Sequence, residues 1–171
     1  MQRNVLEYLD SDVERFPNKV AYTDENQEVT FLELQTSAMQ LGTAISQKVG
    51  NINRPIAILV DRNVESLMGF MGILYSGNFY VPIDNKMPLK RMESVLDQLN
   101  PELVLYGTLD SQIVQNFEGK YPLLSLQKGL SQEEADVPLL RTRMAKILDI
   151  DPVYIIFTSG STGVPKGIVI A

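Results

Sequence analysis

Short apolar runs alternate with longer amphipathic segments along the chain, and this pattern predicts strands followed by helices. Residues 61–77 and 87–101 repeat apolar positions at helical spacing. Between such segments, β-branched and aromatic residues form short runs typical of buried strands. The runs are PIAILV at 55–60, NFYVPID at 78–84, ELVLYG at 102–107 and YIIF at 154–157. Strands alternating with helices indicate an α/β fold with a largely parallel sheet and flanking helices.

Capping residues indicate where the predicted helices begin and end. In the segment 29–48, Thr30 can accept a hydrogen bond from the Glu33 backbone N–H, while the Glu33 carboxylate reaches back to Thr30. This capping box predicts a helix that starts at about residue 31. For the next helix, Asn63 is the predicted N-cap and Gly77 the predicted C-terminal stop.

Other local signals concern packing and chain breaks. Gly69 and Gly72 lie three residues apart in a predicted helix, where missing side chains would allow close approach to a sheet. Pro82 predicts that its strand lies at the edge of the sheet or ends there. Residues 127–151 are polar and irregular, which favours a surface connection with a short helix near Met144.

Composition narrows the class of protein. The chain has 171 residues, of which 44% are hydrophobic and 21% charged, as expected for one globular domain. The net charge is −6 and basic residues do not cluster, so nucleic acid and anionic membrane are not expected partners. The chain has no cysteine, which excludes disulfides and thiolate metal sites. It has no histidine, which excludes histidine metal sites and a Ser-His-Asp triad. The longest apolar run, 67–75, is too short to span a bilayer, and we expect a cytoplasmic protein.

The segment YIIFTSGSTGVPKG at 154–167 carries the candidate chemistry. Six consecutive residues offer backbone N–H groups and four hydroxyls, and two glycines allow a curled backbone. Such a loop can point several N–H groups at an anion, and a lysine adds a cation, which together suit a polyphosphate. The predicted phosphate-binding residues are Thr158, Ser159, Gly160, Ser161, Thr162, Gly163 and Lys166.

The spacing of this loop excludes the common phosphate-loop motif. Counted from Gly160, the next glycine and the lysine do not fit G-x-x-x-x-G-K-[ST], and Gly167 stands where Ser or Thr is required. A flexible linker remains an alternative, although apolar runs on both sides favour a loop within a core. A Ser–Lys nucleophile, with Ser159 or Ser161 beside Lys166, is a further alternative.

Three segments together resemble one enzyme family. YIIFTSGSTGVPKGIVI at 154–170 is similar to the phosphate-binding signature of the adenylate-forming superfamily, which includes acyl- and aryl-CoA ligases, luciferases and adenylation domains of nonribosomal peptide synthetases. LYSGNFYVPID at 74–84 and VTFLEL at 29–34 resemble segments of the peptide-synthetase group. Tyr75 and Ser76 replace the Lys-Ala usual there, which leaves a stand-alone amino-acid ligase open.

The resemblance implies an N-terminal subdomain fragment of the adenylate-forming enzyme fold, with residues 1–171 ending just after the phosphate-binding loop. Such enzymes use ATP to activate a carboxylate, here expected to be an amino acid, as acyl-AMP and pass it to a carrier-protein thiol. The seven loop residues would hold the β- and γ-phosphates. The family also implies Mg²⁺, but its magnesium ligands and catalytic lysine would lie beyond residue 171. We therefore expect no catalytic residue and no metal ligand within this chain. We also expect no adenylating activity from the chain alone.

Two other functional classes stay open at this point. One is an acyl- or aryl-CoA ligase, and the other is a truncated, non-catalytic nucleotide-binding or interaction module. Because a parallel sheet is normally covered on both faces, part of a larger domain should leave apolar surface uncovered. We therefore also expect the chain to self-associate.

Overall fold

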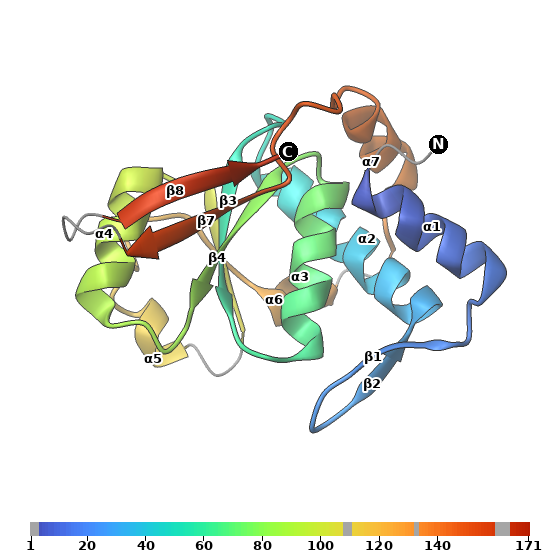
Figure 1. Ribbon diagram of the computed structural model, residues 1–171, viewed down its shortest axis with the longest axis horizontal. Coiled ribbons are helices and arrows are strands. Elements are labelled where there is room, and N and C mark those ends of the chain that lie inside the picture. The colour runs from blue at the N-terminus through green and yellow to red at the C-terminus, as the bar shows by residue number, and fades with distance from the viewer. Residues whose placement is uncertain (1–3, 108–110, 132–133, 160–164) are drawn as a thin grey trace.

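The computed structural model describes residues 4–107, 111–131, 134–159 and 165–171 (Figure 1). Helices and strands alternate through most of this length. In chain order they are α1 (Val5–Arg15), β1 (Val20–Thr23), β2 (Glu28–Thr30), α2 (Phe31–Lys48), β3 (Pro55–Val60), α3 (Val64–Tyr75), β4 (Phe79–Asp84), α4 (Leu89–Leu99), β5 (Leu103–Tyr106), α5 (Ser111–Val114), β6 (Leu123–Ser125), α6 (Leu126–Leu130), α7 (Val137–Met144), β7 (Tyr154–Ser159) and β8 (Pro165–Ile170).

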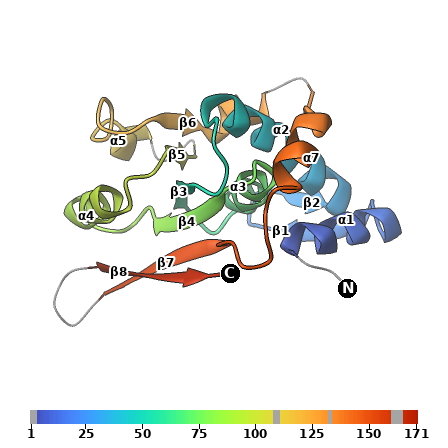
Figure 2. The same ribbon diagram turned by 90° about the horizontal axis from the view of Figure 1, so that it is seen from above.

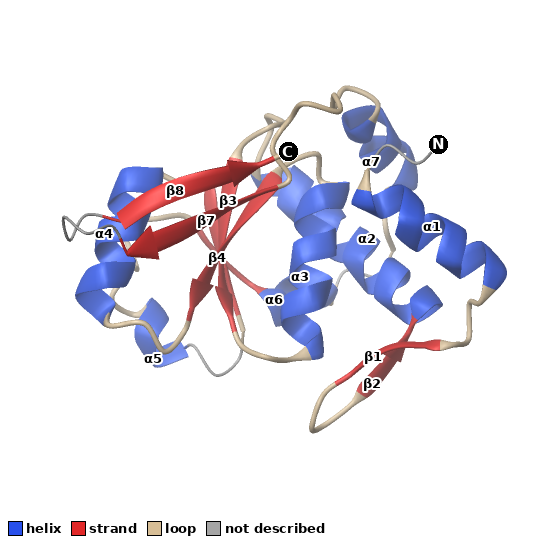
Figure 3. Ribbon diagram, in the orientation of Figure 1, coloured by secondary structure: helices blue, strands red, loops and turns tan. Residues whose placement is uncertain are grey.

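A six-stranded sheet forms the centre of the molecule, in the order β6-β5-β3-β4-β7-β8. Neighbouring strands are parallel except for β7 and β8, which form an antiparallel hairpin at one edge. The strands β1 and β2 form a separate small hairpin (Figure 3). The predicted α/β fold with a largely parallel sheet and flanking helices is confirmed.

Helices cover the sheet on two faces. On one face, α2, α3 and α6 bury residues of β3 and β5 such as Ile56, Ile58 and Leu105. On the other face, α4 packs with the α5 region against Ala57 and Val104. Figure 2 shows α4 and α5 on one side of β3 and β4, and α3 and α2 on the other. Alternating strand residues thus enter two different cores, as the two-residue period of a strand requires.

A third apolar cluster attaches α1 and α7 to the outside of α2 and α3. Its buried members include Leu6 and Leu9 of α1, Ala38 of α2, Tyr75 of α3 and Leu140 of α7. The helices α1 and α7 therefore form an outer layer at the end of the molecule away from α4 and α5 (Figure 1).

The predicted helix caps are present. The Glu33 backbone N–H donates to Thr30 Oγ1 at 3.3 Å, and the Thr30 N–H donates to Glu33 Oε2 at 2.9 Å. Asn63 accepts from the Ser66 N–H at 2.9 Å at the start of α3. Gly77 follows α3 with a φ of 73°, a conformation that suits glycine and ends the helix.

The two glycines of α3 pack against different elements. A Cβ at Gly69 would lie 2.3 Å from Ile58 Cδ1 of β3, so this glycine does permit close approach to the sheet. A Cβ at Gly72 would lie 2.9 Å from Leu41 Cβ, which belongs to α2. The prediction that both glycines face the sheet is therefore wrong for Gly72, which lies at a helix–helix crossing.

Pro82 lies in β4, which is an interior strand and not the edge of the sheet. The edge prediction was wrong, although a local reason explains why proline is tolerated. The Tyr80 N–H points toward β7 and donates to the Val153 carbonyl at 3.2 Å. Two residues later, Pro82 faces the same way, but the register between β4 and β7 contains only Tyr80 and Tyr154. The missing N–H of Pro82 therefore costs no ladder hydrogen bond to β7.

The described residues of segment 127–151 contain more buried structure than their polarity indicated. It contains the end of α6 and all of α7, and Leu140 and Arg143 of α7 are buried. The expected short helix near Met144 is present, because α7 ends at that residue. The prediction that this helix lies in a surface connection was wrong for α7, which contributes to the third apolar cluster.

Candidate functional site

The candidate phosphate-binding residues lie at the turn of the β7–β8 hairpin. Thr158 pairs with Lys166 and Ser159 pairs with Pro165 in antiparallel register. The Thr158 hydroxyl donates to the Lys166 carbonyl at 3.5 Å, and both side chains are exposed. Of the other predicted residues, Gly160, Ser161, Thr162 and Gly163 lie outside the described residues.

The local sequence explains how this hairpin forms. β7 is rich in apolar and β-branched residues, and β8 returns beside it with Gly167 opposite Phe157. A Cβ at Gly167 would lie 3.1 Å from Ile155 Cγ2 and 3.4 Å from the Phe157 ring. The glycine therefore leaves room for its neighbours on that face, and Phe157 packs against the core beneath α4. Partner residues share a face in an antiparallel pair, so Thr158 and Lys166 lie on the same side of the hairpin.

The hairpin is joined to the sheet at its base, far from the turn. Tyr154 is the residue of β7 in register with β4, and the Val153 N–H donates to the Ile170 carbonyl at 2.8 Å. Three rings stack at this base: the Phe70 and Tyr80 centroids lie 4.5 Å apart, and those of Tyr80 and Tyr154 lie 5.3 Å apart. Burial, and then the neighbouring Tyr154, raise the pKa of Tyr80, so its hydroxyl stays neutral near pH 7.

The prediction that residues 154–157 form a buried strand was only partly right. β7 is present, but Ile156 is 44% exposed. On β8, Ile168, Val169 and Ile170 are also exposed. The reason is the position of the hairpin, whose last strand is at the edge of the sheet and which contacts β4 in register only at Tyr154.

Arg143 is a residue that the sequence reasoning missed. Its guanidinium donates to the backbone carbonyls of Val49, Gly50 and Asn51 after α2 and of Ser76 after α3, at 2.5–3.1 Å. Cations are favoured at helix C-termini, where carbonyl groups lack partners. Nothing in the sequence marked this arginine, because it lies in a polar segment and its four acceptors are main-chain atoms.

A second contact fixes the connection from α7 to β7. The Asn53 side-chain amide donates to Asp151 Oδ1 at 2.9 Å, and Asp151 Oδ2 accepts from the Leu148 N–H at 2.7 Å. Arg143 of α7 and Asp151 of the connection thus both contact the loop that precedes β3.

The described residues fit the ATP expectation. Lys166 presents an exposed ammonium group on the same side of the hairpin as the Thr158 hydroxyl, and both groups can bind phosphate oxygens. Among the residues that the structure describes, no group of three or more acidic, histidine or cysteine side chains could hold a metal ion. That the magnesium ligands lie beyond residue 171 stays a prediction. In the same described ranges, no helix is long and apolar enough to cross a membrane.

Comparison with known proteins shows the family. The model of the AMP-binding enzyme family matches residues 9–171, which include the β7–β8 hairpin. The chain is 33% identical over 166 residues to gramicidin S synthase 2 of Brevibacillus brevis, and 32% identical over 163 residues to tyrocidine synthase 3 of Brevibacillus parabrevis. These matches cover 96% and 95% of the chain. The chain belongs to the AMP-binding enzyme family.

Solved structures with the same fold are longer than this chain. The Klebsiella oxytoca NpsA N-terminal subdomain is 26% identical, with a TM-score of 0.78, over 98% of this chain and 41% of that one. A fatty acyl-adenylate ligase from L. pneumophila, bound to acyl adenylate and pyrophosphate, has a TM-score of 0.81 at 20% identity and shares the fold over 31% of its length. The chain spans only 4% and 2% of the two synthases named above. The resemblance to the N-terminal part of a peptide-synthetase adenylation domain is confirmed.

Proposed function

We propose that residues 1–171 are the N-terminal part of an ATP-dependent adenylating ligase that activates an amino acid as acyl-AMP for transfer to a carrier-protein thiol. The observation that carries this proposal is the family match over 9–171, together with 32% and 33% identity to two peptide synthases across nearly the whole chain. The fatty acyl-adenylate ligase shares only the fold, at 20% identity. An amino-acid substrate is therefore favoured over a fatty acyl group.

In this proposal the β7–β8 turn holds the β- and γ-phosphates of ATP as pyrophosphate leaves. Thr158 and Lys166 are the described residues with suitable groups, and they share one side of the hairpin. Ser159, Gly160, Ser161, Thr162 and Gly163 complete the proposed site. Donors held in place around charge that moves onto the leaving group lower the barrier, and removing one typically costs on the order of 10²-fold in rate.

The test is amino-acid-dependent exchange of labelled pyrophosphate into ATP, measured on the product of the complete reading frame. Lys166→Ala should lower the exchange rate on the order of 10²-fold, since a charged donor to the phosphates is lost. Lys128→Ala, which removes an exposed lysine of α6, is the matched control and should leave the rate unchanged. Wild-type exchange in the Lys166 variant, or no exchange with any amino acid, would overturn the proposal.

We further propose that the 171-residue chain does not catalyse adenylation by itself. The chain matches 41% of the NpsA N-terminal subdomain and a small part of each synthase. Most of the length of these proteins therefore has no counterpart in the 171 residues. The same exchange assay on this chain should therefore give only background incorporation. Robust exchange by the chain alone would contradict this part of the proposal.

A further inference from the structure

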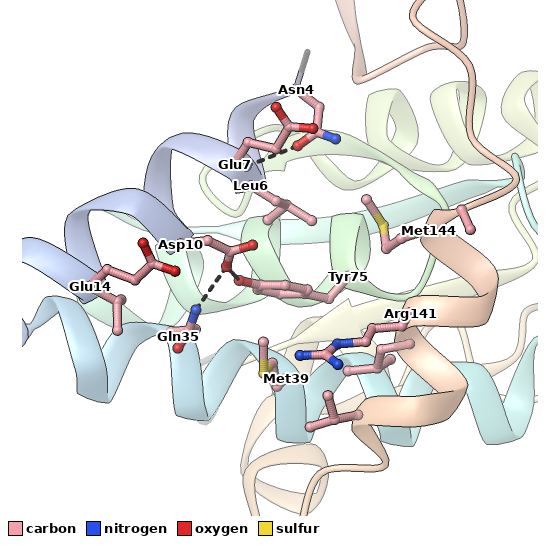
Figure 4. A pocket seen from close by; sticks show the side chains of 14 residues that line it. Asn4, Leu6, Glu7, Asp10, Glu14, Gln35, Met39, Tyr75, Arg141 and Met144 are labelled. Carbon is pink, nitrogen blue, oxygen red and sulfur yellow. Dashed lines mark hydrogen bonds between the residues drawn. The ribbon is translucent and has the colours of Figure 1, made fainter. Parts of the chain in front are cut away.

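A cavity lies at the end of the molecule away from the β7–β8 turn, between α1, α2 and α7 (Figure 4). Its volume is about 700 Å³, within the usual range of small-molecule sites. Apolar side chains form much of its lining, among them Leu6, Met39, Leu140 and Met144. Leu6 and Leu140 also belong to the apolar cluster beneath, so part of the lining is continuous with the core.

The α1 side of this cavity carries acidic groups. Asp10 is half-buried, and its Oδ1 accepts from the Tyr75 hydroxyl at 2.6 Å and from the Gln35 amide at 2.8 Å. Burial, and then Asp10, raise the pKa of Tyr75, so the tyrosine stays a donor. Both bonds end on Oδ1, and within the described part of the chain Oδ2 has no hydrogen-bond partner. Glu14, one turn further along α1, adds a second carboxylate to the lining.

The α7 side carries the opposite charge. Arg141 lines the same cavity and is exposed, and in the view of Figure 4 it enters from the side opposite Asp10. In the described ranges Arg141 forms no ion pair with Asp10 or Glu14. The cavity therefore separates an anionic wall from a cationic wall, with apolar surface between them.

We propose that this cavity binds a small zwitterion with an apolar side group, of which a free apolar amino acid is the class. The ammonium group lies against Asp10 Oδ2, the carboxylate against the Arg141 guanidinium, and the side group on the apolar lining. Charge-assisted bonds at both ends suit this arrangement. A polyphosphate would meet the carboxylates of α1, and a polyamine would leave Arg141 facing a second cation. This site involves none of the hairpin residues, so it is independent of the proposed phosphate site.

The test is calorimetric titration of L-leucine into the 171-residue chain. Two probes each lack one charge: L-leucinamide has no carboxylate, and 4-methylpentanoate has no ammonium group. Arg141→Gln should weaken leucine binding about tenfold or more, because a charged hydrogen bond is lost, and should leave leucinamide binding unchanged. Asp10→Asn should weaken both leucine and leucinamide. Glu14 accepts neither the Tyr75 nor the Gln35 hydrogen bond, so Glu14→Gln leaves the attachment of α1 intact. It removes a carboxylate from the lining and should also weaken the binding of leucine and leucinamide. Lys128→Gln is the matched control for loss of a cation.

The outcomes separate this proposal from the phosphate proposal. Saturable leucine binding that depends on Arg141 but not on Lys128 supports it, whatever the result with pyrophosphate. Leucine binding that does not saturate, or that is equal in the wild type and the Arg141 variant, overturns it. A failure of Lys166→Ala to affect exchange would contradict only the phosphate site.

Discussion

At the residue scale, Arg143 connects more separate parts of the chain than Thr158 or Lys166, the predicted site residues whose side chains the structure describes. Its four acceptors follow α2 and α3, and it lies on α7, so one side chain joins three helices. Burial lowers the pKa of its guanidinium from the usual value, but a guanidinium stays protonated in proteins. Its removal would leave carbonyl groups without their charged donor, and an unpaired buried carbonyl is costly.

We predict that Arg143→Met lowers the free energy of unfolding by about 2–4 kcal/mol, because buried carbonyl groups lose charged donors. Lys146→Met, three residues later and exposed, is the matched control and should change stability by less than about 0.5 kcal/mol. Chemical denaturation followed by circular dichroism measures both. Equal stability of the two variants would show that Arg143 does not hold α7.

The sequence located the candidate site but could not give its geometry. The residue types of the loop indicated an anion site, and the structure places Thr158 opposite Lys166. Which donors converge depends on the backbone path of Gly160 to Gly163, which lies outside the described residues. Arg143 could not be predicted, because main-chain acceptors carry no residue-specific signal in a sequence.

At the scale of elements, local signals were reliable and neighbour relations were not. Thr30, Glu33 and Asn63 act within one helical turn, so their caps could be predicted from the sequence alone. The strand order could not, because β5 returns beside β3 and β4 pairs with β7. The same limit explains the errors for Pro82 and Gly72, whose neighbours come from distant parts of the chain.

The crossing of α2 and α3 gives an element-scale prediction. Gly72→Ala should lower the free energy of unfolding by about 1–3 kcal/mol, because the new methyl group would overlap Leu41 Cβ and force the helices apart. Gly50→Ala is the matched control, since a Cβ there meets nothing within 4 Å. Urea denaturation of the two variants compares them directly. A Gly72 variant as stable as the wild type would mean that the helices separate without cost.

At the scale of the whole molecule, the β7–β8 hairpin leaves an apolar surface. Ile156, Ile168 and Ile170 follow one face of the hairpin and are between 38% and 51% exposed. β8 also presents the open edge of the sheet, and open edges favour pairing between chains. Self-association of this chain therefore remains our prediction.

A double variant tests this prediction. Ile168→Ser with Ile170→Ser should shift the chain toward monomer in sedimentation velocity at micromolar concentrations, because less apolar area is buried between copies. Leu148→Ser removes a comparably exposed apolar side chain away from the hairpin and should not change the distribution. A monomeric wild-type chain would contradict the prediction, and so would an unchanged oligomer in the double variant.

Titration of pyrophosphate into the 171-residue chain tests the proposal that the hairpin turn binds the phosphates of ATP. Pyrophosphate needs no adenine pocket, so the loop is measured by itself. We predict saturable binding that Lys166→Ala weakens about tenfold or more, since a charged hydrogen bond to phosphate is lost. Lys128→Ala should bind like the wild type. Absence of saturable binding, or equal affinity in the wild type and the Lys166 variant, would contradict a phosphate site at this turn.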